Sequence, residues 1–487
     1  MLLKELLNGI YKKPLPAAFG YFDVRDVSCD SREEQQDGLF VALAGFKFNG
    51  QDFIKDAIAK GAKIIACHPE VARPDDSNVC YLEVEDPKHF LYAVGVRFYG
   101  DPSSKVKTTG ITGTNGKTTI TYLIESIIHA AWQRCGVIGT INHRIGTRVI
   151  PSKNTTPGFL DNQRYLAQLA EAGIEYCVME ASSHALDQGR LQGIDFAAGI
   201  FTNLTQDHLD YHKNMEAYFR AKSLLFMSLS VEAAAIINVD DDYGRRLTSI
   251  AKAKLFSYAV DRQASIRAQN IQYDLSGSHF EVAFPQGVIK IHTHFIGKHN
   301  VYNILAAFAW GISQGFSPEI IRQGIERLEC VPGRLEPIDN TKGIFIFVDY
   351  AHTDDGLINV LKAVREVTKK KIILVFGCGG DRDRAKRPKM ARAACLGADY
   401  SIVTSDNPRS EEPEAIISEI ITGFTKNNYE ICVDRKEAIG RALALAQKDE
   451  VVLIAGKGHE DYQIFKDRAI KFDEREIIQE CLQSMKS

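Results

Sequence analysis

The sequence predicts an α/β protein of three domains, and three observations lead to that prediction. Short apolar and β-branched runs alternate with segments whose apolar residues recur every three or four positions. A chain of 487 residues is too long for one hydrophobic core. Polar loops follow directly on the buried strands, where open parallel sheets bind their ligands. We place the domains at residues 1–100, 101–333 and 334–487.

Composition predicts a soluble globular protein and argues against several other classes. Apolar residues make up 45% and charged residues 25% of the chain. The net charge of -3 argues against a nucleic-acid partner. The first residues lack the apolar core of a signal peptide, and no run reaches the roughly 20 residues of a membrane span. The ten scattered cysteines include no Cys-x-x-Cys pair. They indicate core residues in a reducing cytoplasm rather than disulfides or a zinc site.

The first domain reads as a small α/β domain. Its expected strands cover residues 38–43, 63–67 and 80–84, and a helix is expected from Phe53 to Ala62. Ser31 and the turn at 45–50 either hold a phosphate or sugar, or are ordinary turn residues.

The stretch Gly-Ile-Thr-Gly-Thr-Asn-Gly-Lys-Thr-Thr at 110–119 predicts a phosphate loop. Apolar residues lead into it from Val106, and a helical apolar face follows it. Such a loop turns its N–H groups onto a phosphate at a helix N-terminus. Lys117 would reach the outer phosphates, and Thr118 would ligate magnesium. The motif is a short variant, because Ile111 stands where the usual pattern has glycine. A glycine turn beside a solvated lysine fits the strand and helix signals less well.

Several polar residues lie near this loop in the predicted sheet. A buried strand at 174–179 ends in Glu180, where a carboxylate is placed to meet a metal. The loop at 202–212 contains His208 and is either a metal or phosphate site or a solvated loop. Lys222 lies on a predicted helix, where a lysine normally reaches the surface. Thr155 and Thr156 precede another helix and could simply cap it.

The last domain predicts a Rossmann-like parallel sheet beyond a hinge at 331–336. Four apolar strands at 344–348, 372–376, 400–404 and 451–455 are each followed by a polar cluster. Their carboxyl ends would share one binding face. Two crevices joined by hinges indicate two substrates brought together by closure, and favour an ATP-driven reaction over simple binding.

Motifs along nearly the whole chain, in order, resemble the Mur ligases of bacterial cell-wall synthesis. They are Gly113–Thr118 with the sequence GTNGKT, NTTP at 154–157, EASSH at 180–184, TNLTQDHLD at 202–210, PGRLE at 332–336 and DYAH at 349–352. The resemblance implies an amide ligase that uses ATP and Mg²⁺. ATP would phosphorylate the D-glutamate side chain of UDP-N-acetylmuramoyl-L-alanyl-D-glutamate, and the amine of a third amino acid would attack the acyl phosphate. Such a ligase serves peptidoglycan synthesis, and through it cell shape and division.

The resemblance also assigns roles to single residues. The expected catalytic residues are Lys117, Glu180, His208 and Lys222, and the expected magnesium ligands are Thr118, Glu180, His208 and Lys222, the last as a carbamate. ATP would contact Thr112, Gly113, Thr114, Asn115, Gly116, Lys117, Thr118, Asn303, Arg334, Asp349 and His352. The UDP-linked substrate would contact Ser31, Asn154, Thr155, Thr156, Ser182, Gln188 and Arg190. The chain departs from the family pattern at Phe46–Phe48, where uracil contacts are expected, at Asn49 and at Asp354.

The loop Asp406-Asn407-Pro408-Arg409 resembles the branch of the family that adds meso-diaminopimelate. An arginine can hold the far carboxylate of that amino acid with two parallel hydrogen bonds. Arg387, Gly456 and Glu460 match further contacts in that branch. Without the family, a turn with a surface arginine would explain the loop equally well.

Three alternatives stay open. They are a ligase for L-lysine, a relative of folylpolyglutamate synthetase, and a nucleotide-binding regulator without ligase activity. The Asp406–Arg409 loop argues against the first, and the domain before the phosphate loop argues against the second. The polar third-domain crevice argues against the third. We expect a monomer with no membrane or nucleic-acid partner.

Overall fold

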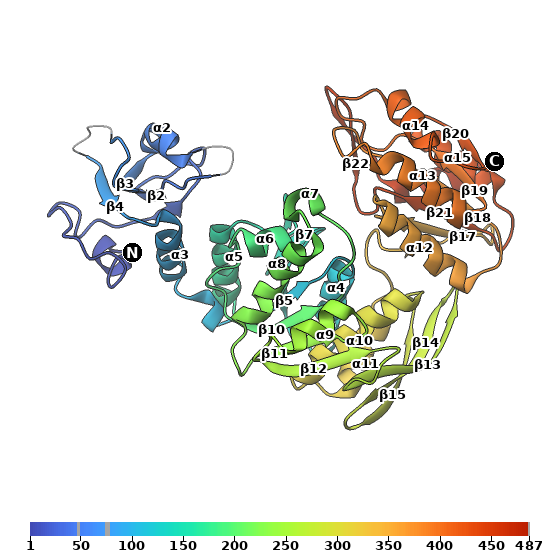
Figure 1. Cartoon of the computed structure of the whole chain (residues 1–487), viewed down its shortest axis with the longest axis horizontal. Helices are drawn as coiled ribbons and strands as arrows, with labels where there is room; N and C mark the ends of the chain where they lie inside the picture. The colour runs from blue at the N-terminus through green and yellow to red at the C-terminus, as the bar shows by residue number, and fades with distance from the viewer. Residues whose placement is uncertain (46–48, 74–77, 486–487) are drawn as a thin grey trace. The chain divides into compact units, whose positions relative to one another are not determined.

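The computed structural model describes residues 1–45, 49–73 and 78–485 (Figure 1). The chain forms two compact units, each built from several segments. The first unit comprises Met1–Asn115, Gln133–Ile236 and Tyr243–Leu255, and the second comprises Gly116–Trp132, Ile237–Asp242 and Phe256–Ser487. The predicted phosphate loop therefore has one half in each unit. The expected uracil contacts around Phe46–Phe48 lie outside the described residues, and the domain boundaries at 100 and 333 stay a prediction.

The first unit begins with a parallel sheet in the order β1-β2-β3-β4. Aliphatic side chains are buried on both of its faces. The three predicted strands are confirmed, but Ala62 belongs to β3 and not to a helix. The helix before it ends at Ala59, and Gly61, at φ 104°, turns the chain into the strand. The elements are α1 (Leu3–Leu6), β1 (Asp26–Ser28), β2 (Gly38–Val41), η1 (Gly50–Phe53), α2 (Ile54–Ala59), β3 (Ala62–Cys67), β4 (Cys80–Glu83), α3 (Pro87–Phe98) and η2 (Pro102–Ser104).

The remainder of the first unit is a sheet in which the phosphate-loop strand, β5, lies between β10 and β9. These strands run parallel, so their carboxyl ends meet at one edge. The elements of this part are β5 (Lys107–Thr112), β6 (Cys135–Ile138), β7 (Asn142–Ile145), β8 (Arg148–Pro151), α5 (Phe159–Glu171), β9 (Tyr176–Glu180), α6 (Ser183–Asp187), β10 (Phe196–Phe201), α7 (Leu209–His212), α8 (Met215–Ser228) and α9 (Asp242–Thr248). Two strands, β11 (Ala234–Asn238) and β12 (Lys254–Ala259), begin in the first unit and end in the second.

The second unit contains the phosphate-loop helix α4 (Lys117–Ala130), which packs on α10 (Lys298–Ser313) and α11 (Pro318–Arg327). A Cβ on Gly324 of α11 would lie 2.4 Å from the Ile127 Cα, so only glycine allows these helices to approach so closely. The same unit holds three antiparallel strands, β13 (Ile266–Asp274), β14 (Gly277–Phe284) and β15 (Gly287–Thr293). These strands were not predicted from the sequence, although buried and exposed residues alternate along β13.

The chain ends in a sheet of order β16-β17-β21-β18-β19-β20, parallel except for β16. Helices α12, α13 and α14 cover one face and α15 and α16 the other, so the predicted doubly covered sheet is confirmed (Figure 1). The four predicted strands are β17, β18, β19 and β21. The elements are β16 (Glu336–Pro337), β17 (Phe345–Asp349), α12 (Asp354–Val367), β18 (Ile372–Phe376), α13 (Lys386–Gly397), β19 (Tyr400–Val403), α14 (Pro413–Ile421), β20 (Tyr429–Ile431), α15 (Arg435–Leu445), β21 (Val451–Ala455), β22 (Tyr462–Ile464), β23 (Ala469–Lys471) and α16 (Glu474–Ser484).

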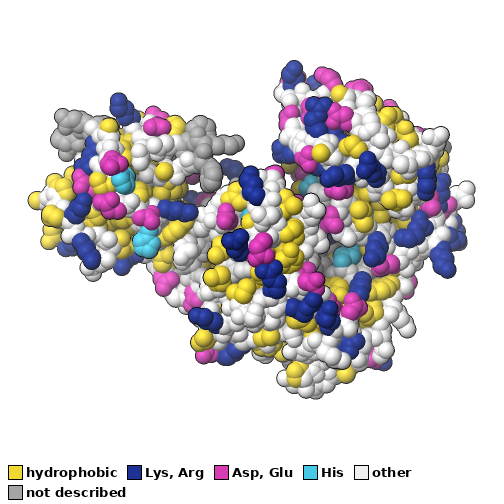
Figure 2. Space-filling model, viewed as in Figure 1, with side chains coloured by type: hydrophobic (Ala, Val, Ile, Leu, Met, Phe, Trp, Pro, Cys, Tyr) yellow, Lys and Arg dark blue, Asp and Glu magenta, His cyan; other side chains and the backbone are white. Residues whose placement is uncertain are grey.

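The surface and the cysteines agree with the composition. Figure 2 shows basic and acidic side chains interspersed over the face in view. Across the described residues, we find no helix with the length and hydropathy that a bilayer span requires. All ten cysteines are free, and six are buried, as expected of small core residues.

Candidate active site

The first half of the phosphate loop is held by the end of β10. Gly113 has a φ of 151°, and a Cβ there would lie 1.8 Å from the Thr202 Oγ1. The Thr202 hydroxyl donates to the Asn115 carbonyl at 2.6 Å. The Asn115 N–H donates to the Asn203 Oδ1 at 3.0 Å. Glycine at 113 is thus required by both conformation and space, and Thr202 and Asn203 shape the loop.

Lys222 contacts this half of the loop and is buried. The usual surface position of a helical lysine therefore does not apply to it. Its side chain is 1% exposed, whereas Leu224 on the same helix is 41% exposed. The ammonium donates to the Gly113 carbonyl at 2.7 Å and lies 4.5 Å from the centre of the Tyr218 ring. The Tyr218 hydroxyl lies 3.3 Å from the Thr114 Oγ1. The helix therefore turns a lysine inward because the loop carbonyl needs a donor.

The second half of the loop opens α4 in the second unit. Gly116 has a φ of 91°, and a Cβ there would lie 2.3 Å from the Asn303 Oδ1. The Asn303 Nδ2 donates to the Asn300 Oδ1 at 3.0 Å, and both asparagines lie on one face of α10. Thr118 is buried, and the Arg334 Nη2 donates to its hydroxyl at 3.4 Å. Asn303 and Arg334, both predicted to bind ATP, thus contact the loop.

Glu180 ends β9 as predicted and is buried. The Thr140 N–H donates to its Oε1 at 2.8 Å, and the Thr140 hydroxyl donates to its Oε2 at 2.9 Å. A Cβ on Gly139 would lie 2.7 Å from the Oε1. The carboxylate is therefore held in one orientation by two donors and a glycine. Thr140 was missed by the sequence analysis, although it follows the strand β6.

Most residues predicted for the UDP-linked substrate lie together beside Glu180. The Thr156 hydroxyl donates to the Glu180 carbonyl at 2.6 Å, and the Ser182 N–H donates to the Thr156 Oγ1 at 3.1 Å. The Arg190 Nη1 donates to the Thr156 carbonyl at 3.1 Å, and its Nε and Nη2 donate to the Gln188 Oε1 at 3.0 and 2.6 Å. The network brings together residues predicted from three separate motifs.

The other three residues predicted for this substrate lie at the margin of that network or outside it. The Thr155 Oγ1 lies 3.1 Å from the Thr140 Oγ1, and Asn154 is exposed. Ser31 lies in the loop between β1 and β2 and is half-buried.

A cluster of rings joins the loop after β9 to the loop after β10. The His184 ring lies 4.8 Å from that of His208 and 4.3 Å from that of Tyr211, measured between ring centres. Burial, followed by the nearby imidazoles, lowers the pKa of His184. His212 places its Nε2 2.9 Å from the Ser183 Oγ. Within segment 202–212, His212 is buried in this cluster whereas His208 is exposed, and a metal or phosphate role for the segment stays a prediction.

Asp349 and its neighbours form a compact group at the end of β17. The Asp349 carboxylate accepts the N–H groups of Leu335 and Ala351 at 2.7 and 2.8 Å. Burial raises the pKa of Asp349, and Arg334 opposes that rise. The Arg334 guanidinium lies 5.1 Å from the centre of the Tyr350 ring, and the His352 Nδ1 lies 2.9 Å from the Tyr350 carbonyl. Arg334, Asp349 and His352, which are predicted to contact ATP, thus lie together.

The predicted amino-acid loop follows β19 and meets the loop after β21. The Asn407 Nδ2 donates to the Glu460 Oε2 at 2.9 Å. Arg409 has a φ of 53°, and its Nη1 donates to the Gly380 carbonyl at 2.8 Å. Gly456 has a φ of 124°, and a Cβ there would lie 2.7 Å from the Asp406 Oδ2. Pro408 is buried between Asn407 and Arg409. These predicted residues therefore form one cluster built from two loops.

Arg387, on α13, pairs with two carboxylates of the protein itself. Its side chain is fully buried, and its Nη1 and Nη2 donate to the two Glu411 oxygens at 2.9 and 2.7 Å. The Nη1 also donates to the Glu419 Oε2 at 2.8 Å. The side-chain hydrogen bond from Arg387 lowers the pKa of Glu411 to about 2. In this conformation the guanidinium joins α13 to α14, and its diaminopimelate contact stays a prediction.

Two buried cations near this cluster were missed by the sequence analysis. Lys457 is fully buried, with its ammonium 3.1 Å from the Asn407 Oδ1. Arg435 pairs with the equally buried Glu474 and donates to the Ala455 carbonyl at 2.9 Å. Their position inside the Gly456–Glu460 motif and at the start of α15 was the available signal.

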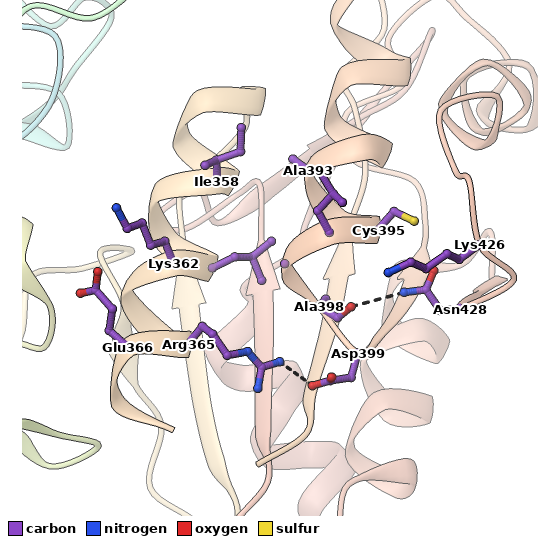
Figure 3. A pocket seen from close by; sticks show the side chains of 13 residues that line it. Ile358, Lys362, Arg365, Glu366, Ala393, Cys395, Ala398, Asp399, Lys426 and Asn428 are labelled. Atoms are coloured by element: carbon purple, nitrogen blue, oxygen red, sulfur yellow. Dashed lines mark hydrogen bonds and ion pairs between the residues drawn. The ribbon is translucent and has the colours of Figure 1, made fainter. Parts of the chain in front are cut away.

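A separate groove of about 690 Å³ lies at the opposite end of β19. It is lined by Leu361, Cys395, Asp399 and Lys426, and Figure 3 shows Arg365 paired with Asp399 there. Asp399 precedes β19, whereas Asp406–Arg409 follow it. The groove includes none of the predicted site residues.

The phosphate loop at the end of β5 lies beside the buried Lys222 and near the carboxylate of Glu180. This arrangement is typical of nucleotide-binding α/β proteins. Family models match the chain at residues 23–94 (Mur ligase family, catalytic domain), 111–311 (Mur ligase middle domain) and 333–458 (Mur ligase, glutamate ligase domain). The chain belongs to the Mur ligase family, and the predicted α/β fold is confirmed.

Relatives and a solved structure match over the full length. The chain is 42% identical to the UDP-N-acetylmuramoyl-L-alanyl-D-glutamate--2,6-diaminopimelate ligase of Clostridium tetani, with 100% of both chains covered. It is 43% identical to ligase 1 of the same name from Clostridium acetobutylicum, again over 100% of both. A solved structure of a ligase with that name matches with a TM-score of 0.72 and 32% identity, covering 99% of each chain.

Proposed function

We propose that the protein is an ATP-dependent amide ligase that adds meso-diaminopimelate to the D-glutamate of UDP-N-acetylmuramoyl-L-alanyl-D-glutamate, a step in peptidoglycan precursor synthesis. Full-length relatives carry the name of a ligase for these two substrates. The observation that carries the choice of amino acid is the position of Arg409, on the loop that the Asn407 amide links to Glu460. ATP and a UDP-linked substrate place the reaction in the cytoplasm, and we propose a monomer.

The phosphate loop would hold ATP while the substrate carboxylate attacks its terminal phosphate, which forms an acyl phosphate and releases ADP. Carboxylate and triphosphate repel each other, and Lys117 at the start of α4 would neutralise the charge that builds up between them. The amine of the incoming amino acid then displaces phosphate from the acyl phosphate, forming the amide bond. The contact of Arg334 with Thr118 and that of Asn303 with Gly116 support roles for both residues at the ATP site.

Magnesium belongs to the proposal, with Thr118, Glu180, His208 and Lys222 as the residues that would hold it. Mg²⁺ takes few protein ligands and fills its shell with water and phosphate oxygens. Across the described residues, no group of three or more His, Cys, Asp or Glu is placed to hold a metal. The held carboxylate of Glu180 is a suitable oxygen donor. When bound, the ion would offset phosphate charge. Lys222 could ligate it only as a carbamate.

The network beside Glu180 would bind the muramoyl-dipeptide. Arg190 can meet a carboxylate of the dipeptide, and burial lowers the pKa of its guanidinium without removing its charge at neutral pH. Thr156 and Ser182 connect that network to the end of β9. The substrate carboxylate would therefore be positioned near Glu180.

The third-domain cluster would recognise both ends of the far amino-acid group of diaminopimelate. Arg409 would pair with its carboxylate, and Glu460 would pair with its ammonium. L-lysine lacks that carboxylate, so it would leave Arg409 without its partner. An L-lysine ligase is therefore the second candidate function. The assay described next distinguishes it from a diaminopimelate ligase.

The test is phosphate release from ATP by the purified protein with UDP-N-acetylmuramoyl-L-alanyl-D-glutamate. Meso-diaminopimelate and L-lysine are supplied in separate reactions. We expect release with diaminopimelate and only background release with lysine. Release with lysine alone would overturn the assignment of Arg409, and release with neither would favour a nucleotide-binding regulator.

A further inference from the structure

Lys457 is a fully buried lysine between the two loops of the proposed amino-acid site. Its ammonium lies 3.1 Å from the Asn407 Oδ1 and 3.2 Å from the Glu460 Oε2, and 5.5 Å from the centre of the Tyr462 ring. Asn407 follows β19, whereas Glu460 follows β21. A buried ammonium is stable only where such partners compensate its lost hydration. Lys457 therefore ties the two loops together.

The contacts of Lys457 determine which way the Asn407 amide faces. The Asn407 Oδ1 accepts from both the Lys457 ammonium and the Ile464 N–H, the latter at 2.9 Å. With its oxygen held by two donors, the amide must direct its Nδ2 to the Glu460 Oε2. Both Asn407 and Lys457 use the Oε2, which leaves the Oε1 as the oxygen that we assign to the substrate ammonium.

The charge of Lys457 also acts on the neighbouring carboxylate of Asp406. Burial alone would raise the pKa of Asp406, but Lys457 and Arg435 lower it overall. Arg435 is already paired with Glu474. Lys457 contributes more to that lowering than Arg435 does, and its ammonium also lies 3.2 Å from the Glu460 Oε2.

We propose that Lys457 is a positioning residue for amino-acid recognition, which holds the Asn407 amide and the Glu460 carboxylate in the arrangement that binds the ammonium of the incoming amino acid. The inference rests on the proposed function. It assigns Lys457 no contact with the reacting atoms.

The test compares Lys457→Met with the wild type by steady-state phosphate release. Loss of the ammonium should raise the KM for meso-diaminopimelate about tenfold or more, because a charge-assisted contact to Glu460 is lost. The KM for ATP should stay within about twofold. Lys457→Gln keeps a donor and should raise the diaminopimelate KM less than Lys457→Met does. It also provides a second variant if Lys457→Met does not fold.

A double variant separates positioning from general destabilisation. Glu460→Gln and Lys457→Met should have non-additive effects on the diaminopimelate KM, because both disturb one arrangement. Arg322→Met, which breaks a partly exposed cation–carboxylate pair on α11, should leave that KM unchanged. An equal rise in the KM for ATP, or additive effects, would overturn the positioning role alone. A wild type that is inactive with every amino acid would overturn the proposed function, and this inference with it.

Discussion

Lys222 illustrates how far a single residue can depart from its usual behaviour. Lysine is almost never fully buried unless it is paired. Here the ammonium donates to the Gly113 carbonyl and is stacked near Tyr218, while the neighbouring Leu224 is exposed. The helical apolar pattern alone could not predict this reversal, because the partner of Lys222 is a backbone carbonyl from a distant loop. Either form of Lys222, the ammonium or the carbamate, would act on the phosphate loop from this position.

Lys222→Ala should lose most of its activity, by about a hundredfold or more, since a charged group in a buried site is removed. If the working group is a carbamate, acetate or propionate should restore part of the rate. If it is an ammonium, methylamine should restore it instead. The measurement is phosphate release at saturating substrates with each additive. Rescue by neither would leave both roles unsupported.

At the scale of the element, the phosphate loop depends on glycines whose partners come from other parts of the chain. The strand β5 and the helix α4 were predictable from their own apolar patterns. The closeness of Asn303 to Gly116 was not, because Asn303 lies on α10. Local pattern determines that a loop forms, and packing determines which side chains border it.

Gly116→Ala should raise the KM for ATP about tenfold or more, because its φ of 91° is strained for alanine and its Cβ would lie 2.3 Å from the Asn303 Oδ1. Gly315→Ala is the matched control. Gly315 has a φ of 82° but no atom within 4 Å of its Cβ. It should lose about 1–2 kcal/mol of stability with an unchanged KM for ATP. Equal kinetic effects in both variants would contradict a role for the contact with Asn303.

At the scale of the whole molecule, the last sheet gathers loops from the ends of four parallel strands. Its order, β17-β21-β18-β19, was not readable from the sequence, because strand order depends on which crossovers pack together. Ion pairs of two buried arginines hold its helices and loops, with Arg387 joining the partly exposed Glu411 and Glu419, and Arg435 joining the buried Glu474. These pairs make stability depend on pH.

Glu411 should contribute stability that is lost in acid. Its pKa is lowered to about 2 in the folded protein by the Arg387 hydrogen bond, against about 4.3 for an unpaired glutamate. The folded state therefore binds fewer protons, and the contribution is complete above about pH 4.3 and disappears as pH falls through 2. Urea midpoints at pH 5 and pH 3 should differ less in Glu411→Gln than in the wild type. Glu480→Gln, at an exposed pair with Lys436, is the control and should behave like the wild type.

The sequence by itself determined the fold class, most strands, the phosphate loop and the identity of most candidate site residues. Its motifs are local, and apolar spacing with glycine placement is a local property. Tertiary structure alone decided that Lys222 is buried, that Lys457 ties Asn407 to Glu460, and that Arg387 is enclosed by two carboxylates. Each of these depends on partners from other loops or helices, and burial and hydrogen bonding between distant segments are set by packing rather than by local pattern.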